Sequence, residues 1–277
     1  ETTKRFHGDW ALWKATDERR TQLTWETPWG TGFPGWHIEC TAMSLGAFGD
    51  QIDIHTGGID LRFPHHENER AQSNSLTGAE VVSSWVHAEH LLFEGRKMSK
   101  STNNVVLLTD VMAAGISAAA VRLVFLENHY RQQLNLTWDS LVAAEQTIRR
   151  WSDQLTGPLN FDAELKTEIS AHLLNNIDTA AAVLALRAKE KQLAKSPELR
   201  ANAIATAAGL LGLSLVSEPI EVTAELKKLI DERSSARAEK NWQLSDQIRD
   251  QIAEFGFEVN DTSSGVQLRR AIVPPRA

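Results

Sequence analysis

The feature that most constrains the fold is a change in sequence pattern near Leu107. Residues 1–104 are rich in Gly, Trp and His, and short strand-like segments such as Gln51–His55 and Leu91–Phe93 lie between Gly and Pro turns. This alternation is typical of an α/β domain. Beyond Leu107 the sequence changes to long Ala-rich segments with the apolar spacing of helices. The chain has 277 residues, so we expect two or three domains.

The part after Leu107 is predicted to contain a helical bundle. One helix has Thr137 as its N-cap and ends at Gly157-Pro158, and apolar residues recur along it every three or four positions. Further helices are predicted over Phe161–Leu174, Thr179–Lys195 and Glu198–Leu211.

The C-terminal residues form a separate predicted module. Leu213–Pro219 is typical of a linker, and charged helices follow from about Thr223 and over Leu244–Phe255. Two strands, Phe257–Asn260 and Val266–Arg269, are joined by a turn. The predicted division of the chain is therefore 1–106, 107–158, 159–218 and 222–277.

Composition excludes several classes of protein. Hydrophobic residues make up 42% and charged residues 23%, which excludes a disordered or collagenous chain. The net charge of −7 argues against unspecific coating of nucleic acid but leaves room for local basic patches. No apolar run is long enough to cross a membrane, and no basic-then-apolar leader follows Glu1. A single cysteine favours a reducing compartment, so we expect a cytoplasmic protein.

Cys40 and the segment from His65 to Glu69 contain candidate metal ligands. Thiolate, imidazole and carboxylate are the donors that zinc takes in proteins. His65 and Glu69 are four residues apart, so both project from one face if a helix begins there. From spacing alone, His66 with Glu69 is a competing ligand pair, and Cys40 could also be an inert buried thiol. Three protein ligands would leave a position open for a substrate.

The pentapeptide Lys97-Met98-Ser99-Lys100-Ser101 is a candidate phosphate clamp. Two lysines and two serines after a Gly-containing turn can hold a polyphosphate and stabilise the charge that develops as pyrophosphate leaves. An arbitrary basic pentapeptide would more often be a solvated loop. This order of residues is a known signature.

The KMSKS sequence is the second signature of class I aminoacyl-tRNA synthetases, and the chain resembles the cysteinyl-tRNA synthetases among them. The resemblance covers nearly the whole chain in the order and spacing of that family. The segments that carry it are Asp9–Lys14, Gly35–Cys40, Gly57–Leu61, Phe63–Glu69, Lys97–Ser101, His129–Arg131 and Arg237–Arg270.

The resemblance implies that cysteine is activated with ATP and Mg²⁺ to cysteinyl-adenylate and then transferred to the 3′ end of tRNA(Cys). A Zn²⁺ ion would be held by Cys40, His65 and Glu69 and would select cysteine through its thiolate. The remaining residues that match family positions are Trp36 and His55 for cysteine, Gly57, Gly58 and Asp60 for ATP, and Lys97 and Lys100 as catalytic lysines, Lys100 being the main pyrophosphate contact.

The resemblance also gives each predicted part of the chain a role. The fold class is α/β plus all-α. Residues 1–106 would be the C-terminal half of a class I Rossmann catalytic domain, 107–158 a helical stem-contact region, and 159–218 a DALR-like helical bundle. Residues 222–277 would be a small mixed α/β module that recognises the anticodon. In it, Arg237, Trp242, Asp246 and Asp261 match tRNA-binding positions, and Arg233 belongs to the same basic set. Leu268 replaces a tryptophan usual in the family, which weakens stacking there.

Two family signatures are absent from these residues: the HIGH tetrapeptide and the first zinc cysteine. We therefore expect an N-terminal half of the catalytic domain as a partner, in the same or a separate chain, and no activity of residues 1–277 alone. Two alternatives remain. One is a tRNA-independent cysteine ligase of the mycothiol pathway, against which the segment Ala236–Arg270 argues. The other is a non-catalytic tRNA-binding paralogue, which would not need an intact clamp and zinc ligands.

Overall fold

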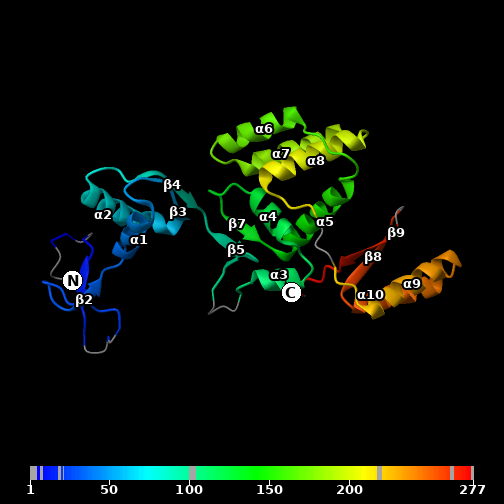
Figure 1. The fold of residues 1–277 in the computed structure, drawn as a ribbon, viewed down its shortest axis with the longest axis horizontal. Helices are drawn as coiled ribbons and strands as arrows, with labels where there is room; N and C mark the ends of the chain where they lie inside the picture. The colour runs from blue at the N-terminus through cyan, green and yellow to red at the C-terminus, as the bar shows by residue number, and fades with distance from the viewer. Residues whose placement is uncertain are drawn as a thin grey trace. The chain divides into compact units, whose positions relative to one another are not determined.

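The computed structural model describes residues 5–6, 9–17, 20, 22–99, 104–216, 220–262 and 265–275. The chain forms two compact units, which consist of residues 1–90 with 130–132, and of residues 91–129 with 133–277. Figure 1 labels helices and strands of both units. The four predicted domain boundaries stay predictions.

The first unit is mixed α/β. Its elements are β1 (Trp13–Ala15), β2 (Gly32–Pro34), α1 (Ile38–Phe48), β3 (Ile52–Gly58), the 3₁₀ turn η1 (Ile59–Leu61), the irregular turn η2 (Arg62–His66), α2 (Glu67–Thr77) and β4 (Val82–Ala88). Strands β1 and β2 form an antiparallel pair. Strands β3 and β4 are parallel, with Ile52 opposite Val82, and α1 packs on α2. The predicted strand Gln51–His55 is therefore confirmed, and it continues to Gly58.

The second unit begins with a small sheet and is otherwise mainly helical. Its elements are β5 (Leu91–Phe93), β6 (Arg96–Lys97), α3 (Leu108–Ala113), α4 (Ala118–Leu126), β7 (Leu134–Leu136), α5 (Trp138–Gln154), α6 (Ala163–Leu174), α7 (Thr179–Gln192), α8 (Pro197–Leu211), α9 (Ala224–Ala238), α10 (Trp242–Glu254), β8 (Phe257–Thr262) and β9 (Gly265–Arg270). Strand β5 lies between β6 and β7. Among the described residues no helix is long and apolar enough to span a bilayer.

Helix α5 shows why these sequences form helices. The Thr137 hydroxyl accepts from the Ser140 amide at 3.0 Å, and the Ser140 hydroxyl accepts from the Thr137 amide at 3.1 Å. This reciprocal cap occupies two amides that a helix start leaves without partners. The buried residues Leu141, Ala144, Ile148 and Trp151 follow helical spacing, as the sequence predicts.

The second unit contains two hydrophobic cores. The larger core joins β5, β7 and α3 through α8, with Trp151 fully buried within it. The smaller core lies between α9, α10 and the antiparallel pair β8–β9, around Leu226, Ile248 and Ile252. The C-terminal module predicted for residues 222–277 thus has a core of its own, although Ile272 packs against the larger one.

Candidate functional site

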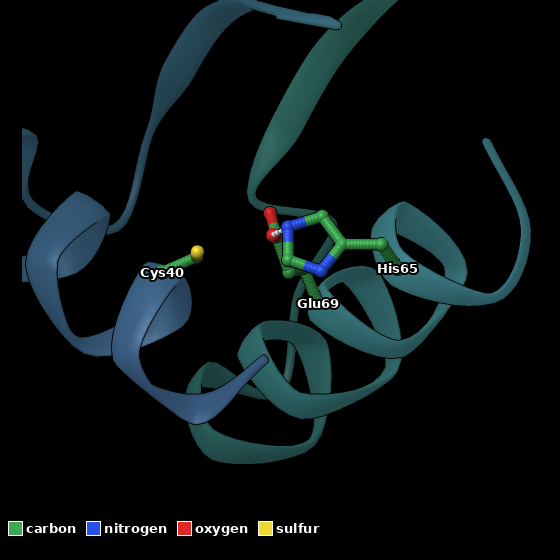
Figure 2. Close-up of side chains that lie close together, drawn as sticks. All are labelled: Cys40, His65 and Glu69. Carbon is green, nitrogen blue, oxygen red and sulfur yellow. Dashed lines mark ion pairs between the residues drawn. The ribbon is translucent and has the colours of Figure 1, made fainter. Parts of the chain in front are cut away.

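The metal ligands predicted from sequence converge in the first unit (Figure 2). Cys40 lies in the first turn of α1, His65 in η2 and Glu69 in the first turn of α2. The Sγ atom of Cys40, a ring nitrogen of His65 and a carboxylate oxygen of Glu69 all lie within 4.8 Å of one another. Two segments distant in the sequence, the start of α1 and the junction of η2 with α2, therefore direct a thiol, an imidazole and a carboxylate at one point.

Glu69 is the centre of this site, and its carboxylate is shared. Nε2 of His65 lies 2.5 Å from one carboxylate oxygen, and Nε2 of His55 lies 3.2 Å from the other. Glu69 is only 4% exposed, so its carboxylate has little contact with water and depends on these neighbouring groups. A buried carboxylate is costly unless hydrogen bonds or a cation satisfy it.

The carboxylate lies within a cluster of histidines, of which the sequence analysis did not single out His37 and His87. Five of the nine histidines of the chain gather here, namely His37, His55, His65, His66 and His87. The Nδ1 atoms of His37 and His65 are in contact, and Nδ1 of His66 lies 2.9 Å from Nε2 of His87. The only local sign of a special role for His37 is its backbone, which has a φ of 89° before α1.

Burial and neighbouring groups shift the titration of the site. Burial raises the pKa of the Cys40 thiol, and the nearby Glu69 carboxylate raises it further. Burial and the charges of His55, His87 and His65 lower the pKa of His66 to about 4. Burial and His65 lower the pKa of His37 as well. These shifts favour the neutral form of His37 and His66, and neutral imidazole is the form that binds metals.

The residues present fit a zinc ion. Cys40, His65 and Glu69 are typical zinc donors, and their ligand atoms lie close enough together to bind one ion. A cation there would also offset the carboxylate charge that keeps the thiol protonated. The ligand atoms of His55, His66 and Glu69 form a second group and also lie within 4.8 Å of one another, so the alternative ligand His66 could also bind a metal ion. The Cys40 group differs by containing a soft sulfur donor.

The predicted cysteine and ATP residues lie around the same strands. The indole of Trp36 donates to Nδ1 of His65 at 3.1 Å, although the Trp36 ring itself is exposed. Gly57 and Gly58 end β3, and Asp60 follows in η1. They therefore lie at the carboxyl end of a parallel strand pair, where α/β proteins commonly bind ligands.

A cavity of about 430 Å³ adjoins this strand end, lined by Ile59, Arg62, Trp85, His87, Glu89 and Arg131. The structure also gives Gly57 a packing role. A Cβ at this position would lie 2.6 Å from Cε1 of His66, so glycine is needed there even without a nucleotide.

The lysine clamp belongs to the second unit. Lys97 ends β6 and is exposed, whereas Lys100 lies outside the described residues. Asn104, which sequence reasoning did not single out, contacts the backbone on both sides of Met98. Its amide donates to the Lys97 carbonyl at 3.1 Å and its carbonyl accepts from the Ser99 amide at 2.9 Å.

The predicted tRNA-binding residues lie together in the C-terminal module. Arg237 contacts the Asp261 carboxylate at 3.3 Å, and its guanidinium carbon lies 5.4 Å from the centre of the Trp242 ring. Asp246 pairs with Arg249 at 3.2 Å. Buried Arg233, which the sequence placed only in a basic set, binds both oxygens of Asp261. Leu268 packs against the core of the module.

Comparison with known proteins bears on these residues. The family model of the class I (C) tRNA synthetase catalytic domain matches residues 1–146. Curated cysteine–tRNA ligases are similar to 97–98% of the chain, with 37% identity to that of Chlamydia abortus and 39% to that of Opitutus terrae. The chain spans 62% and 59% of the length of these two relatives.

A solved structure shares the fold at low identity. It is that of LeuRS of Agrobacterium radiobacter K84 in a ternary complex with tRNA and LeuAMS, with a TM-score of 0.51 and 16% identity over 72% of this chain and 34% of the LeuRS chain. The mixed α/β and helical fold is thus that of class I synthetases, as the motifs predicted. Because the family model covers more than half of the residues, the chain belongs to the class I (C) tRNA synthetase family.

Proposed function

We propose that this chain forms part of a cysteine–tRNA ligase, which activates cysteine with ATP and Mg²⁺ to cysteinyl-adenylate and transfers it to tRNA(Cys). The observation that carries the proposal is the convergence of Cys40, His65 and Glu69 in a chain 37% identical to a cysteine–tRNA ligase. Cysteine differs from serine by one small atom, and shape alone discriminates poorly on that scale. A thiol-selecting metal site is therefore the feature that such an enzyme needs.

Cys40, His65 and Glu69 would hold Zn²⁺ in this proposal. When bound, Zn²⁺ would supply a soft Lewis acid that prefers a thiolate to a hydroxyl. The protein side chains do the rest. Glu69 fixes the orientation of His65 and His55 through its two oxygens. Trp36 and His55 would line the cysteine pocket. His55 contacts one carboxylate oxygen of Glu69, and His65 contacts the other.

The ATP-binding part of the proposal rests on Gly57, Gly58 and Asp60. Their place at the carboxyl end of β3 and beside a cavity supports it. Asp60 could accept from ribose hydroxyls. Lys97 and Lys100 would hold the phosphates and stabilise the charge of departing pyrophosphate. Asn104 would brace the loop, since it bonds to the backbone of both Lys97 and Ser99.

The C-terminal module would bind the anticodon loop of tRNA(Cys) through Arg237, Trp242, Asp246 and Asp261. Unpaired loop bases offer faces for stacking and edges for hydrogen bonds. The exposed Trp242 ring beside Arg237 supports this role. A cysteine ligase with a small acceptor does not need this module, which has a core of its own, so its presence argues against that alternative. The intact metal ligands argue against a non-catalytic paralogue. An N-terminal half of the catalytic domain is the proposed partner, and the cytoplasmic location stays a prediction.

Metal analysis tests the proposal. In the full-length ligase, Cys40→Ser should lower the zinc content and strongly reduce cysteine-dependent ATP–pyrophosphate exchange. Met43→Ser introduces the same residue on an exposed position of the same helix and serves as the matched control. Full zinc content in both Cys40→Ser and His65→Ala would refute the ligand assignment. Zinc lost in His66→Ala but kept in Cys40→Ser would point to the group of His55, His66 and Glu69.

A further inference from the structure

Arg233 is a buried arginine whose charge is directed at one carboxylate. Its side chain projects from α9 and is only 4% exposed. Nη1 donates to Oδ1 of Asp261 at 2.8 Å, and Nη2 donates to Oδ2 at 2.9 Å. Two parallel hydrogen bonds of this kind fix both the position and the plane of a carboxylate. Asp261 is therefore held in one orientation near the end of β8.

The other side of Asp261 faces groups that can bind a base. Arg237 contacts Oδ2 of Asp261 at 3.3 Å and also lies against the ring of Trp242. The Asp261 side chain is 36% exposed, and Trp242 is 55% exposed. A carboxylate has about four acceptor positions, so the two bonds from Arg233 and the contact with Arg237 still leave room for a further donor. A carboxylate edge, a guanidinium and an aromatic face thus adjoin one another at the surface of the module.

We propose that Arg233 is a positioning residue, which orients Asp261 so that its free acceptor positions receive the exocyclic amino group of an unpaired base stacked on Trp242. The inference rests on the proposed tRNA-binding function of the module. Arg233 itself is too buried to touch RNA, and it would act only through Asp261. The amino group is the matching donor because an ionised carboxylate can only accept. Guanine, cytosine and adenine carry such a group, and uracil does not.

The charges around Asp261 support this assignment. The hydrogen bonds and charge of Arg233, with the charge of Arg237, hold the pKa of Asp261 below its usual range. Asp246 on α10 acts on Arg233 and raises the pKa of that guanidinium, as Asp261 does. Asp261 therefore stays an acceptor at neutral pH. Protonation would turn one of its oxygens into a donor and would weaken recognition of an amino group.

Binding of modified anticodon stem-loop RNAs to the 277-residue chain tests the proposal. Three RNAs each lack one amino group of the cysteine anticodon GCA, with inosine, zebularine or nebularine in place of the natural nucleoside. Fluorescence anisotropy should show that one of them binds the unmodified protein about tenfold or more weakly, as expected for a lost hydrogen bond to a charged group. That loss should disappear in Asp261→Asn and in Arg233→Met.

The protein variants separate positioning from general support of the fold. Arg233→Met should weaken binding of the natural stem-loop about tenfold or more, and it should cause no further loss when added to Asp261→Asn. Arg233→Lys, which keeps the charge but not the fork, should lie between. Lys228→Met removes a charge from an exposed position of the same helix and should bind as the unmodified protein does. Circular dichroism checks that each variant is folded. If Arg233→Met is unfolded, the affinity of Arg233→Lys for the stem-loop tests the inference in its place.

Three results would contradict the inference. If Asp261→Asn weakens binding while both Arg233 variants bind normally, Arg233 does not position Asp261, and the tRNA-binding function stands. If Arg233→Met causes an equal further loss in the Asp261→Asn background, its effect does not pass through Asp261. If the unmodified chain binds no stem-loop RNA, the tRNA-binding function of the module fails, and the inference fails with it.

Discussion

Asp261 makes the C-terminal module sensitive to acid at the level of a single residue. Arg233 and Arg237 lower its pKa in the folded protein. A carboxyl group with a depressed folded pKa stabilises the fold above its unfolded pKa of about 4, and this contribution disappears as the pH falls through the folded pKa. The buried Arg233 would then lie beside a neutral partner. The module should therefore lose stability below about pH 4.

The first prediction is that Asp261→Asn flattens this acid dependence. The variant should be less stable than the unmodified chain at pH 7, because Arg233 loses its ionised partner. The difference should shrink as the pH falls below about 4. Urea unfolding across this pH range, with hydrogen exchange as the probe of the module, measures the stability difference. Asp250→Asn, on an exposed carboxylate of α10, is the control and should leave the profile unchanged. An equal stability difference at all pH values would contradict the prediction.

Gly115 contributes to stability through its backbone conformation. Its φ is 81°, and a Cβ there would lie 2.1 Å from the carbonyl oxygen of Ala271. Both the conformation and the close approach require glycine. The second prediction is that Gly115→Ala destabilises the second unit by more than about 1 kcal/mol. Gly209→Ala is the matched control, since Gly209 lies in helix α8 with no atom near its virtual Cβ. It should instead stabilise by about 0.5–1 kcal/mol. Thermal melts measure the stability of both variants. A change of the same sign in the two melting temperatures would contradict the prediction.

The predictability of the candidate site differs between its residues. Cys40, Glu69 and one of the adjacent histidines His65 and His66 could be named as candidate ligands from donor type and from their spacing. His37 and His87 could not, because they reach the site from α1 and β4 through contacts with His65 and His66. Local periodicity contains no information about such distant contacts. The choice of His65 over His66 came from the family resemblance and not from spacing.

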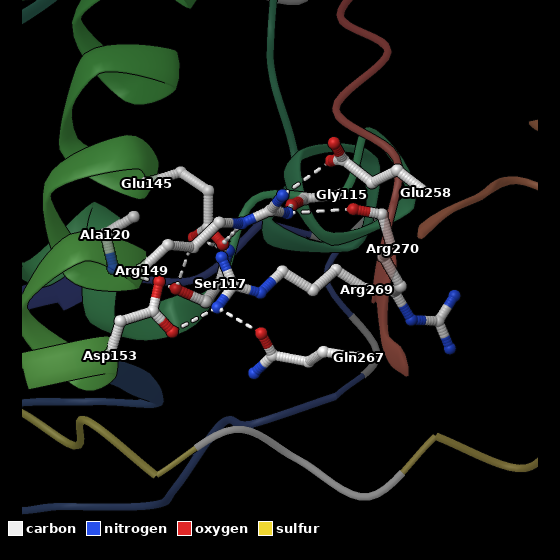
Figure 3. A network of polar contacts seen from close by, with 10 residues as sticks. All are labelled: Gly115, Ser117, Ala120, Glu145, Arg149, Asp153, Glu258, Gln267, Arg269 and Arg270. Atoms are coloured by element: carbon white, nitrogen blue, oxygen red, sulfur yellow. Dashed lines mark hydrogen bonds and ion pairs between the residues drawn. The ribbon is translucent and has the colours of Figure 1, made fainter. Parts of the chain in front are cut away.

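Helix α5 is the element that joins the C-terminal strands to the larger helical core (Figure 3). Arg149 binds Glu145 at 2.7 Å, Glu258 of β8 at 2.6 Å and the carbonyl of Arg270 at 2.8 Å. Glu145 is buried and also accepts from the amide and hydroxyl of Ser117. One mostly buried guanidinium therefore connects residues more than a hundred positions apart in the sequence.

The third prediction is that Arg149→Met destabilises the second unit by about 3 kcal/mol, because it leaves the buried Glu145 carboxylate without its charged partner. Adding Glu145→Gln should recover part of this loss, since no buried charge then remains. Arg150→Met is the control on the same helix. Arg150 is exposed, and its contact with Glu190 is long, at 3.8 Å. The loss of this weak surface pair should cost less than about 1 kcal/mol. Equal destabilisation by the two single variants, measured by urea unfolding, would show that Arg149 is no more than a surface charge.

At the scale of elements, the helical part was the easier one to predict. Caps such as Thr137 and apolar spacing lie within each helix, so α5, α9 and α10 begin within a few residues of their predicted positions. The parallel partner of β3 was not identified. The pairing of Ile52 with Val82 depends on a crossover through α2, and β4 contains two consecutive exposed serines, which interrupt the apolar pattern of a buried strand. Non-local pairing is decided by packing that one segment does not encode.

At the scale of the whole second unit, two cores and one returning tail determine how the module is attached. The module has its own core around Ile248 and Ile252. The tail after β9 goes back to the larger core, where Ile272 packs and the Val273 amide donates to the Ala114 carbonyl at 2.9 Å. Arg149 and the Arg269–Asp153 pair add contacts beside it. The module therefore has a core of its own and also contributes to the stability of its neighbour.

The fourth prediction concerns removal of the module by ending the chain after Val216. The remaining helices should fold, because their core is complete apart from Ile272. The melting temperature should fall by about 5 °C, from the loss of roughly 1.5 kcal/mol of apolar burial together with the partners of Arg149. In the full-length ligase the same truncation should leave cysteine-dependent ATP–pyrophosphate exchange largely intact and should strongly reduce charging of tRNA(Cys). Ile272→Ala in the complete ligase is the matched control, since it should reproduce most of the thermal shift without the charging defect. If truncation abolished exchange and charging alike while the helices stayed folded, the module would support the catalytic domain, and a role restricted to tRNA recognition would be wrong.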